Sequence, residues 1–154
     1  MGQRPSMSIV DIEKYPAKEF KWTRIFIKNF LTLFLKYALM LVKYGDDWRK
    51  HPEGSKNIGS IMKKIYWKIY RISQVPEYDY LAIERIAKKL RDKLVDGDRC
   101  RICGYRLKKD NVLSMYCHYR GKHKKYVEFE LSNIAVEEYI YLLERNGVLS
   151  SIPS

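Results

Sequence analysis

Apolar residues recur at helical spacing in three long segments of the first two thirds of the chain. The segment from Glu19 to Tyr44 is apolar around most of its circumference, with its polar residues in one narrow stripe. A helix of this kind is usually buried among other helices. Two further segments, about Lys56 to Ser73 and about Tyr80 to Val95, each carry one apolar stripe. The pattern predicts a helical body with the first segment in its core.

Turn and capping residues mark the ends of these segments. Gly45 follows the first one, and Pro76 separates the second from the third. Asp79 can cap the third helix, because its carboxylate can accept hydrogen bonds from the free amides of the first turn. Gly97 supplies a C-terminal stop. The three helices are therefore predicted to end near residues 44, 73 and 95.

The last third of the chain predicts strands before a final helix. The stretch Val112–Tyr119 is rich in β-branched and aromatic residues, which favours a strand. Lys124–Leu131 alternates apolar with polar positions, and Arg120–Lys122 between them fits a hairpin turn. Ser132 then caps a helix over about Asn133–Arg145. The end of this stretch is equally compatible with part of a winged helix.

Candidate metal ligands are concentrated in one short segment. All three cysteines and two of the three histidines lie between residues 100 and 123. Cys100 and Cys103 have C-x2-C spacing followed by Gly104, as in a zinc knuckle, where a tight turn aims two thiolates at one ion. An odd number of cysteines beside histidines favours metal over a disulfide framework, and with it a reducing, cytoplasmic location. The first residues show no apolar core of a signal peptide.

The second half of the site has two completions. His118 and His123 close it as C-x2-C-x14-H-x4-H, which resembles a C2H2 zinc finger with a slightly longer loop. That resemblance implies that Leu107 and Met115 occupy the two core positions of the family. It also implies that Asp110 caps a short helix.

The other completion uses Cys117 with His123, as C-x2-C-x13-C-x5-H. Over about residues 98–145 this resembles the zinc β-ribbon of large serine recombinases, in which C-x2-C-G is followed by a hairpin and a Y-x-C strand. Adjacent residues on a strand face opposite ways, so Cys117 and His118 are not both expected to reach the ion. The β-propensity of this stretch favours Cys117 with His123, and His118 in place of Cys117 is the alternative.

These features together predict an α+β fold, mostly α. A basic helical unit over residues 1–97 precedes a unit over residues 98–154, which holds a zinc-stapled β-hairpin and a C-terminal helix. A site with four protein ligands has no open position for water, so the predicted Zn2+ is structural. The sequence shows no phosphate-binding loop, paired-carboxylate motif or serine triad, and we expect a protein that is not an enzyme.

Charge points to a polyanionic partner. Lysine and arginine number 30 against 18 acidic residues, for a net charge of +12. Residues 99–125 contain nine basic residues and one acidic residue, so they carry +8. Such an excess favours nucleic acid, and we expect DNA rather than RNA, in a regulatory role. The expected contacts are a stripe at Lys64, Lys68 and Arg71 and the residues around the metal: Arg99, Arg101, Arg106, Lys108, Lys109, Arg120, Lys122, Lys124 and Lys125.

Two other functions are compatible with the sequence. Residues 126–154 carry one basic and five acidic residues, a net charge of −4. This acidic end and the apolar first helix suit a small zinc-bearing interaction module or inhibitor that docks on a nucleic-acid machine such as a polymerase. A membrane span in this first helix is disfavoured, because its charged residues leave no uncharged run near the ~20 residues that a span needs. Attachment to a membrane surface through Phe20–Tyr44 is a third, less favoured function.

Overall fold

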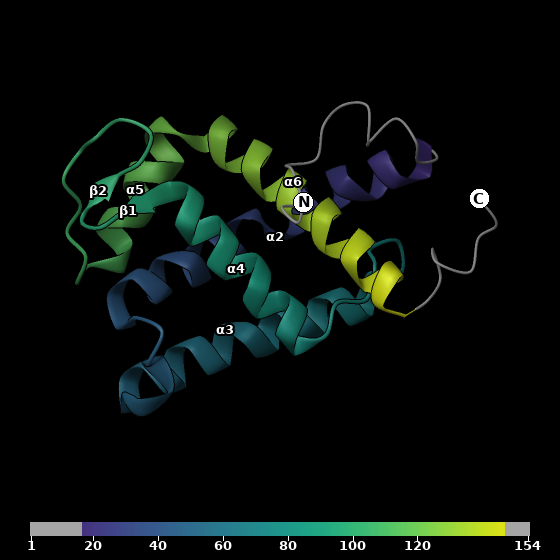
Figure 1. The fold of residues 1–154 in the computed structure, drawn as a ribbon, viewed down its shortest axis with the longest axis horizontal. Helices are drawn as coiled ribbons and strands as arrows, with labels where there is room; N and C mark the ends of the chain where they lie inside the picture. The colour runs from purple at the N-terminus through teal and green to yellow at the C-terminus, as the bar shows by residue number, and fades with distance from the viewer. Residues whose placement is uncertain (1–16, 147–154) are drawn as a thin grey trace.

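A computed structural model describes residues 17–146, and side chains from residue 21 onward. Residues 1–16 and 147–154, the outer ends of the two predicted units, lie outside the described part. In Figure 1 the hairpin and α5 lie at one end of a bundle in which α4 runs between α3 and α6. The elements in chain order are α2 (Ala17–Tyr44), η1 (Trp48–Lys50), α3 (Pro52–Arg71), α4 (Tyr80–Leu94), β1 (Val95–Asp96), β2 (Arg99–Cys100), α5 (Val112–Lys122) and α6 (Lys124–Arg145).

Helix α2 forms the centre of the core. It contacts α3, α4, α5 and α6, which explains why most of its circumference is apolar. Phe26, Phe30 and Phe34 lie one turn apart on it, and all three are fully buried. One continuous apolar core joins helices on both sides of residue 97. The division into two units at that point remains a prediction.

Most of α2 also meets the simple criteria for a membrane span. Lys21–Tyr44 is long and apolar enough to cross a membrane, judged by length and composition alone. The core helix of a soluble protein and a signal sequence meet the same criteria. Half of its most apolar stretch is buried inside this structure, where it packs against the other helices.

Helices α3 and α4 follow the predicted patterns. The predicted stripe of α3 is buried at Ile58, Ile61, Ile65 and Ile69. The helix begins earlier than predicted, at Pro52, because proline is well suited to a first helical turn. In α4 the Asp79 side chain accepts a hydrogen bond from the Ala82 amide at 2.8 Å, which confirms the predicted cap.

Both strands predicted after the cysteines are wrong. Val112–Tyr119 lies within α5, and Lys124–Leu131 forms the first turns of α6. The apolar positions that suggested alternation in the second stretch also fit helical spacing. Val127, Leu131 and Ile134 are buried on one face of α6, whereas Phe129 is 61% exposed. Packing of that face against α2 and α4 decided between the two periods, as tertiary contacts commonly override local strand propensity.

The hairpin of this fold lies earlier in the chain than predicted. Strands β1 and β2 pair antiparallel, with Val95 opposite Cys100 and Asp96 opposite Arg99. The turn between them contains Gly97, whose φ of +66° is in the left-handed region. The predicted class, a mostly helical α+β fold with a hairpin followed by C-terminal helix, is confirmed, although two helices follow the hairpin and not one.

Two glycines in open space, one at a helix end and one in a helix interior, test opposite effects of the glycine backbone. Gly45 has φ of +77° after the last turn of α2, and Gly59 lies inside α3; a Cβ at either would meet nothing within 4 Å. Gly45→Ala should cost about 1–2 kcal/mol, because an L-residue is strained at positive φ. Gly59→Ala should stabilise by about 0.5–1 kcal/mol, because alanine favours a helix interior. Urea denaturation of both variants measures this, and shifts of the same sign would contradict it.

Candidate metal centre

A tight turn after β2 positions the two cysteines. The Gly104 amide donates to the Cys100 carbonyl at 2.8 Å, and Gly104 has φ of +78°, so glycine is required here for its backbone conformation. The Ile102 amide donates to the Cys100 sulfur at 3.4 Å. An amide that points at a thiolate stabilises its charge. The turn predicted from C-x2-C-G is therefore present, with Cys100 buried and Cys103 exposed.

Helix α5 brings the first histidine to this turn. The helix is capped by Asn111, whose side chain accepts from the Ser114 amide at 2.9 Å. The expectation that Asp110 is the cap is therefore wrong. Leu107 and Met115 are buried, as the finger-like completion implied. The burial of Met115 orients α5 so that His118 faces the turn, and His118 Nε2 lies 3.5 Å from the Cys103 sulfur.

Tyr119 attaches α5 to the end of α4. Its ring is fully buried, and its hydroxyl donates to the Leu94 carbonyl. Burial, followed by the neighbouring Cys100, raises the pKa of Tyr119 above its usual range. The hydroxyl therefore stays a donor, and the contact holds α5 in register with the hairpin. Nothing in the sequence marked Tyr119 for this role.

His123 reaches the site because the helix is interrupted there. It lies between α5 and α6, with φ of −127° and ψ of 23°. On an uninterrupted helix a residue five positions after His118 would lie about 140° around the axis. The break turns the His123 ring back, and its centroid lies 5.0 Å from that of His118. This explains how the spacing H-x4-H can serve one site.

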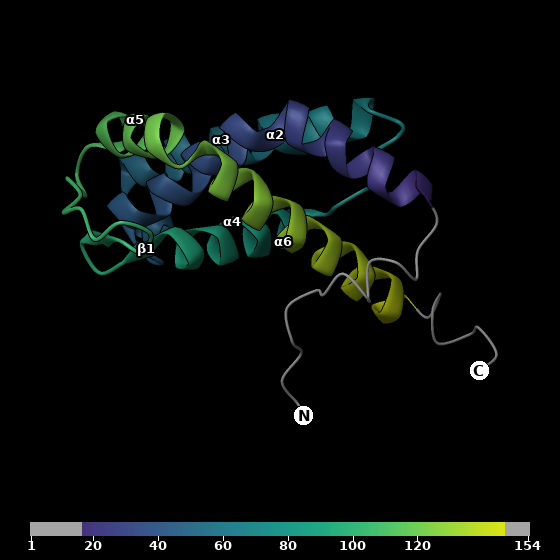
Figure 2. The same cartoon turned by 90° about the horizontal axis from the view of Figure 1, so that it is seen from above.

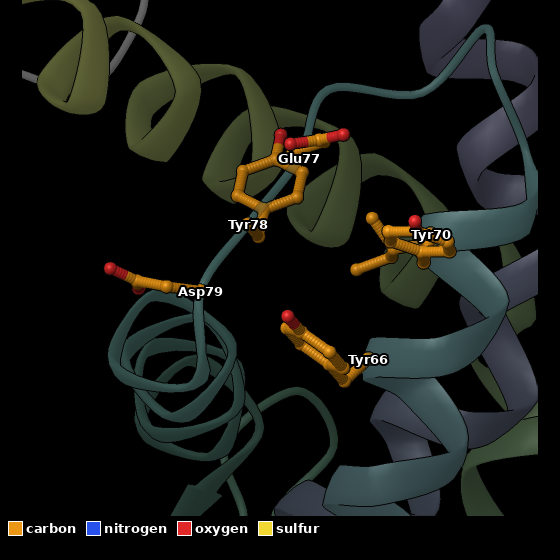
Figure 3. Close-up of a pocket in the computed structure, with 6 residues that line it drawn as sticks. Tyr66, Tyr70, Glu77, Tyr78 and Asp79 are labelled. Carbon is orange, nitrogen blue, oxygen red and sulfur yellow. The ribbon is translucent and has the colours of Figure 1, made fainter.

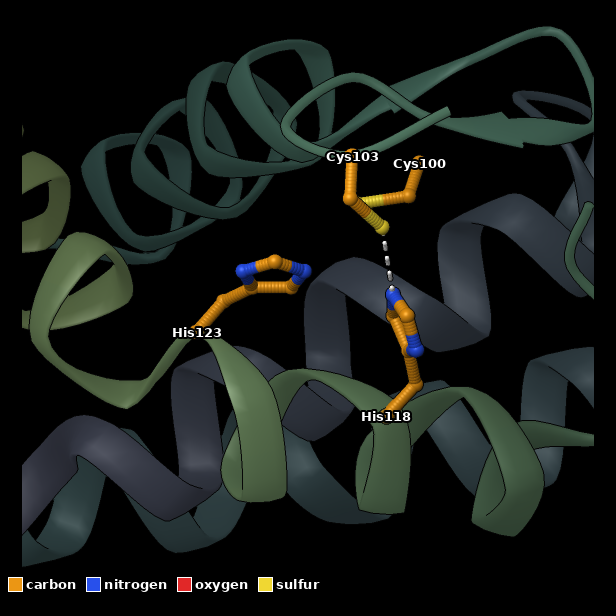
Figure 4. A group of neighbouring side chains, drawn as sticks. All are labelled: Cys100, Cys103, His118 and His123. Atoms are coloured by element: carbon orange, nitrogen blue, oxygen red, sulfur yellow. Dashed lines mark hydrogen bonds between the residues drawn. The ribbon is translucent and has the colours of Figure 1, made fainter. Parts of the chain in front are cut away.

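Four potential ligands meet at one point. One ligand atom from each of Cys100, Cys103, His118 and His123 lies within 4.8 Å of the others, and Figure 4 shows the four side chains converging. A tetrahedral zinc ion separates its sulfur and nitrogen ligands by roughly 3.3–3.8 Å. In addition, Nε2 of His123 is buried without a hydrogen-bond partner in the described part of the chain. The group fits a metal ion with small adjustments.

The completion that the structure assembles is the one with His118. Cys117, the ligand favoured by local β-propensity, is exposed and does not belong to the group. The preference rested on a strand, where neighbours face opposite ways. On the helix that forms, neighbours project about 100° apart, so again only one of Cys117 and His118 faces the turn. Packing of Met115 and Tyr119 into the core selects His118.

The electrostatics of the site favour neutral imidazoles. Burial, then His123 and Lys122, lowers the pKa of His118. Burial, then Lys122, lowers the pKa of His123. Neutral imidazole is the form that binds metal. With two thiolates, a divalent ion would bring the centre to zero net charge, so the centre itself would not neutralise the cations of this segment.

Some of the basic residues predicted as nucleic-acid contacts around the metal are unpaired, and others form ion pairs or hydrogen bonds within the protein. Arg106 pairs with Asp98 at 3.0 Å, and Arg99 donates to the Gly104 carbonyl at 3.1 Å, so both brace the turn. Arg101 and Lys124 form only long ion pairs, of 3.9 and 4.0 Å, and Arg120 is half-buried. The exposed residues whose side chains form neither an ion pair nor a hydrogen bond with any other described residue are Lys108, Lys109, Lys122 and Lys125.

The basic stripe on α3 is not brought to the metal centre. Lys64, Lys68 and Arg71 lie on a different helix, along the lower edge of the bundle in Figure 1. Lys68 also has a structural role, because its amine donates to the Asn29 carbonyl at 3.1 Å. Asn111 was not predicted as the cap of α5, although a polar residue directly before an apolar run is a recognisable signal.

Comparison with protein-family models, curated proteins and solved structures finds no match to this chain. The resemblances to a C2H2 zinc finger and to a zinc β-ribbon are therefore supported only by the residues of the metal site and their arrangement. The structure contains a Cys2His2 group near a hairpin, as a C2H2 finger does. A zinc β-ribbon would place the second ligand pair on a hairpin, and here α5 occupies that place.

Proposed function

We propose that this chain is a zinc-containing DNA-binding protein, in which a structural metal centre supports a basic surface. The observation that carries the proposal is the coincidence of the Cys2His2 group with the most basic segment of the chain. Residues 99–125 carry a net charge of +8, and the four metal-ligand candidates lie in the same segment. Phosphate groups are the natural partners of such a surface.

The metal would fix the shape of this surface. The loop between β2 and α5 contains few apolar side chains, and Leu107 is the buried one among them, at 5% exposed. A zinc ion bound by the two cysteines at the start of the loop and by His118 and His123, within and just after α5, would hold the loop against α5, in a small region that otherwise lacks core. Four protein ligands would fill the zinc coordination shell, so the proposal assigns the centre no catalytic step.

Salt dependence tests the proposal. Binding of duplex DNA should weaken linearly in log–log form as salt rises, because bound counterions are released. In Lys108→Gln/Lys109→Gln the slope should become shallower by about 1 for each lysine that contacts a phosphate. Fluorescence anisotropy with a labelled duplex at several salt concentrations measures both quantities.

The matched control removes the same charge elsewhere. Lys43→Gln/Lys50→Gln alters two exposed lysines at the turn between α2 and α3, and it should leave the slope nearly unchanged. Equal effects of the two double variants would show that net charge alone matters and would contradict the assigned surface. A wild-type slope near zero would contradict DNA binding as a whole. Repeating the titration with duplex RNA tests the preference for DNA.

A further inference from the structure

The outer face of α3 is a second surface with the properties of a binding site. Six exposed side chains lie along this helix at position 56, at the pair 63 and 64, at 67 and at the pair 70 and 71, so that successive groups are seven, three or four residues apart. Such spacing places them on one side of the helix, facing away from the core. We call them the α3 face: Lys56, Lys63, Lys64, Trp67, Tyr70 and Arg71.

Aromatic rings at the C-terminal half of this face form a connected ladder. Tyr80 of α4 stacks on Tyr66 with ring centroids 4.5 Å apart and planes at 11°. Tyr66 contacts Trp67 at 5.4 Å, and Trp67 contacts Tyr70 at 5.7 Å. Trp67 is nevertheless 53% exposed and Tyr70 is 65% exposed. The ladder thus holds two large rings in place while leaving their surfaces open to solvent.

The charge along this face has one sign. No acidic residue occurs between Lys56 and Arg71. Lys64 and Arg71 lie one turn before and one turn after Trp67, on the same flank of it. Neither forms an ion pair with another residue in the described ranges. A row of uncompensated cations therefore borders the exposed rings.

The opposite flank has a different character. A cavity of about 180 Å³ lies there, lined by Tyr66, Tyr70, Tyr78, Glu77 and Asp79 among others. Figure 3 shows Tyr66 and Tyr70 from α3 facing Glu77 and Tyr78 across it. Two carboxylates on this side disfavour phosphate groups. An elongated anion would therefore run along the flank with Lys64 and Arg71, with its uncharged parts over the rings.

We propose that the α3 face binds single-stranded nucleic acid. Unpaired bases stack on Trp67 and Tyr70, and the phosphates contact Lys64 and Arg71. Stacking on aromatic side chains beside a cationic track is the general mode for single strands, and it needs bases free of a duplex. Bases within a duplex are stacked on each other and cannot cover these rings.

An anionic membrane surface fits the same face less well. An interfacial helix lies with its whole apolar face in the lipid. In α3 that face, with Ile58, Ile61, Ile65 and Ile69, is buried in the core of the protein. Only two rings remain on the outer side. This proposal shares with the proposed function the premise of nucleic-acid binding, but it concerns another surface and another form of the ligand.

The intrinsic fluorescence of the protein tests the proposal. The chain has three tryptophans, of which Trp22 and Trp48 are only 5% and 4% exposed. Quenching by added ligand therefore reports mainly on Trp67. Titration with an oligothymidylate should quench the emission saturably, whereas the same length of duplex DNA and the base-free polyanion heparin should not. Quenching by heparin to the same extent would overturn base stacking, and a blue shift with anionic phosphatidylserine vesicles would indicate a membrane surface instead.

Substitutions separate ring stacking from charge. Trp67→Ala and Tyr70→Ala should each weaken oligothymidylate binding roughly 5- to 150-fold, the usual effect of losing one stacked base. Fluorescence anisotropy of a labelled oligothymidylate measures this, because the Trp67 variants lack the intrinsic reporter. Trp67→Phe retains a ring and should bind much more tightly than Trp67→Ala. The matched control is Phe129→Ala, which removes a ring that is 61% exposed on α6 and should leave binding unchanged. Loss of binding in Phe129→Ala equal to that in Trp67→Ala would overturn the assignment.

The two surfaces can fail separately. If duplex DNA binds and Lys108→Gln/Lys109→Gln weakens it, while oligothymidylate leaves Trp67 unquenched, the α3 face is refuted and the proposed function stands. If oligothymidylate quenches Trp67 while duplex DNA does not bind, the α3 face stands and the proposed function fails. Absence of binding to either ligand refutes both.

Discussion

His118→Ala should abolish stoichiometric zinc binding, whereas Cys117→Ser should retain one zinc ion per chain. His118 Nε2 lies 3.5 Å from the Cys103 sulfur within the four-residue group, while Cys117 points to solvent from the same helix. Structural zinc sites contribute about 10–16 kcal/mol of apparent binding free energy in finger peptides. Loss of one ligand should therefore lower the affinity by several orders of magnitude and lower the melting temperature.

Metal analysis of the purified variants, together with thermal denaturation, measures this expectation. His51→Ala is the matched control, because His51 is exposed and outside the group. Chelation of the wild-type protein should reproduce the thermal effect of His118→Ala, and adding a chelator to that variant should change little more. Zinc retained in His118→Ala but lost in Cys117→Ser would refute the ligand set that the structure assembles and restore the alternative with Cys117.

Arg85→Met should destabilise the fold by about 3–5 kcal/mol, because it leaves a buried carboxylate without its partner. Glu138 of α6 has no exposed surface. Its Oε2 atom accepts a hydrogen bond from Arg85 Nε at 2.7 Å. The same oxygen forms an ion pair with the Nη2 atom of the Arg85 guanidinium, also at 2.7 Å. Lys89 is 3.7 Å away and compensates less. The pair joins α4 to α6.

A double variant distinguishes the burial cost from the value of the pair. Arg85→Met/Glu138→Leu removes both charges, so it should be much less destabilised than Arg85→Met alone. Arg91→Met on the same helix is the control, because Arg91 pairs with Asp46 and Asp92, which are both largely exposed. That change should cost under about 1 kcal/mol. Urea denaturation of the four proteins measures the cycle, and a double variant as unstable as Arg85→Met would contradict it.

The burial of Glu138 could have been predicted from the sequence if the helical period of 3.6 residues had been applied to this segment. Val127, Leu131 and Ile134 precede it at helical spacing, and all are buried on the same face of α6. The alternation that suggested a strand over Lys124–Leu131 hid this series. A strand pattern and a helical pattern share several apolar positions over eight residues, and only a longer window separates them.

At the metal site too, the local sequence was compatible with two structures. The sequence contained both candidate ligand sets, and spacing alone could not choose between them. The choice depended on whether the stretch around Met115 and Tyr119 forms a strand or a helix. Local propensity favoured a strand, but the stretch forms a capped helix on which both side chains are buried, with Tyr119 bonded to the Leu94 carbonyl. Long-range packing, absent from any local window, decided the outcome.

By itself the sequence determined the elements whose signals are local and strong. Long apolar stripes, the Asp79 cap and the glycine at the end of α2 located the first three helices, and C-x2-C-G located the turn of the metal centre. The tertiary structure alone decided which histidines meet that turn, which carboxylate is buried, and which rings stay exposed on α3. These depend on contacts between segments far apart in the chain, where small differences in packing outweigh local preference.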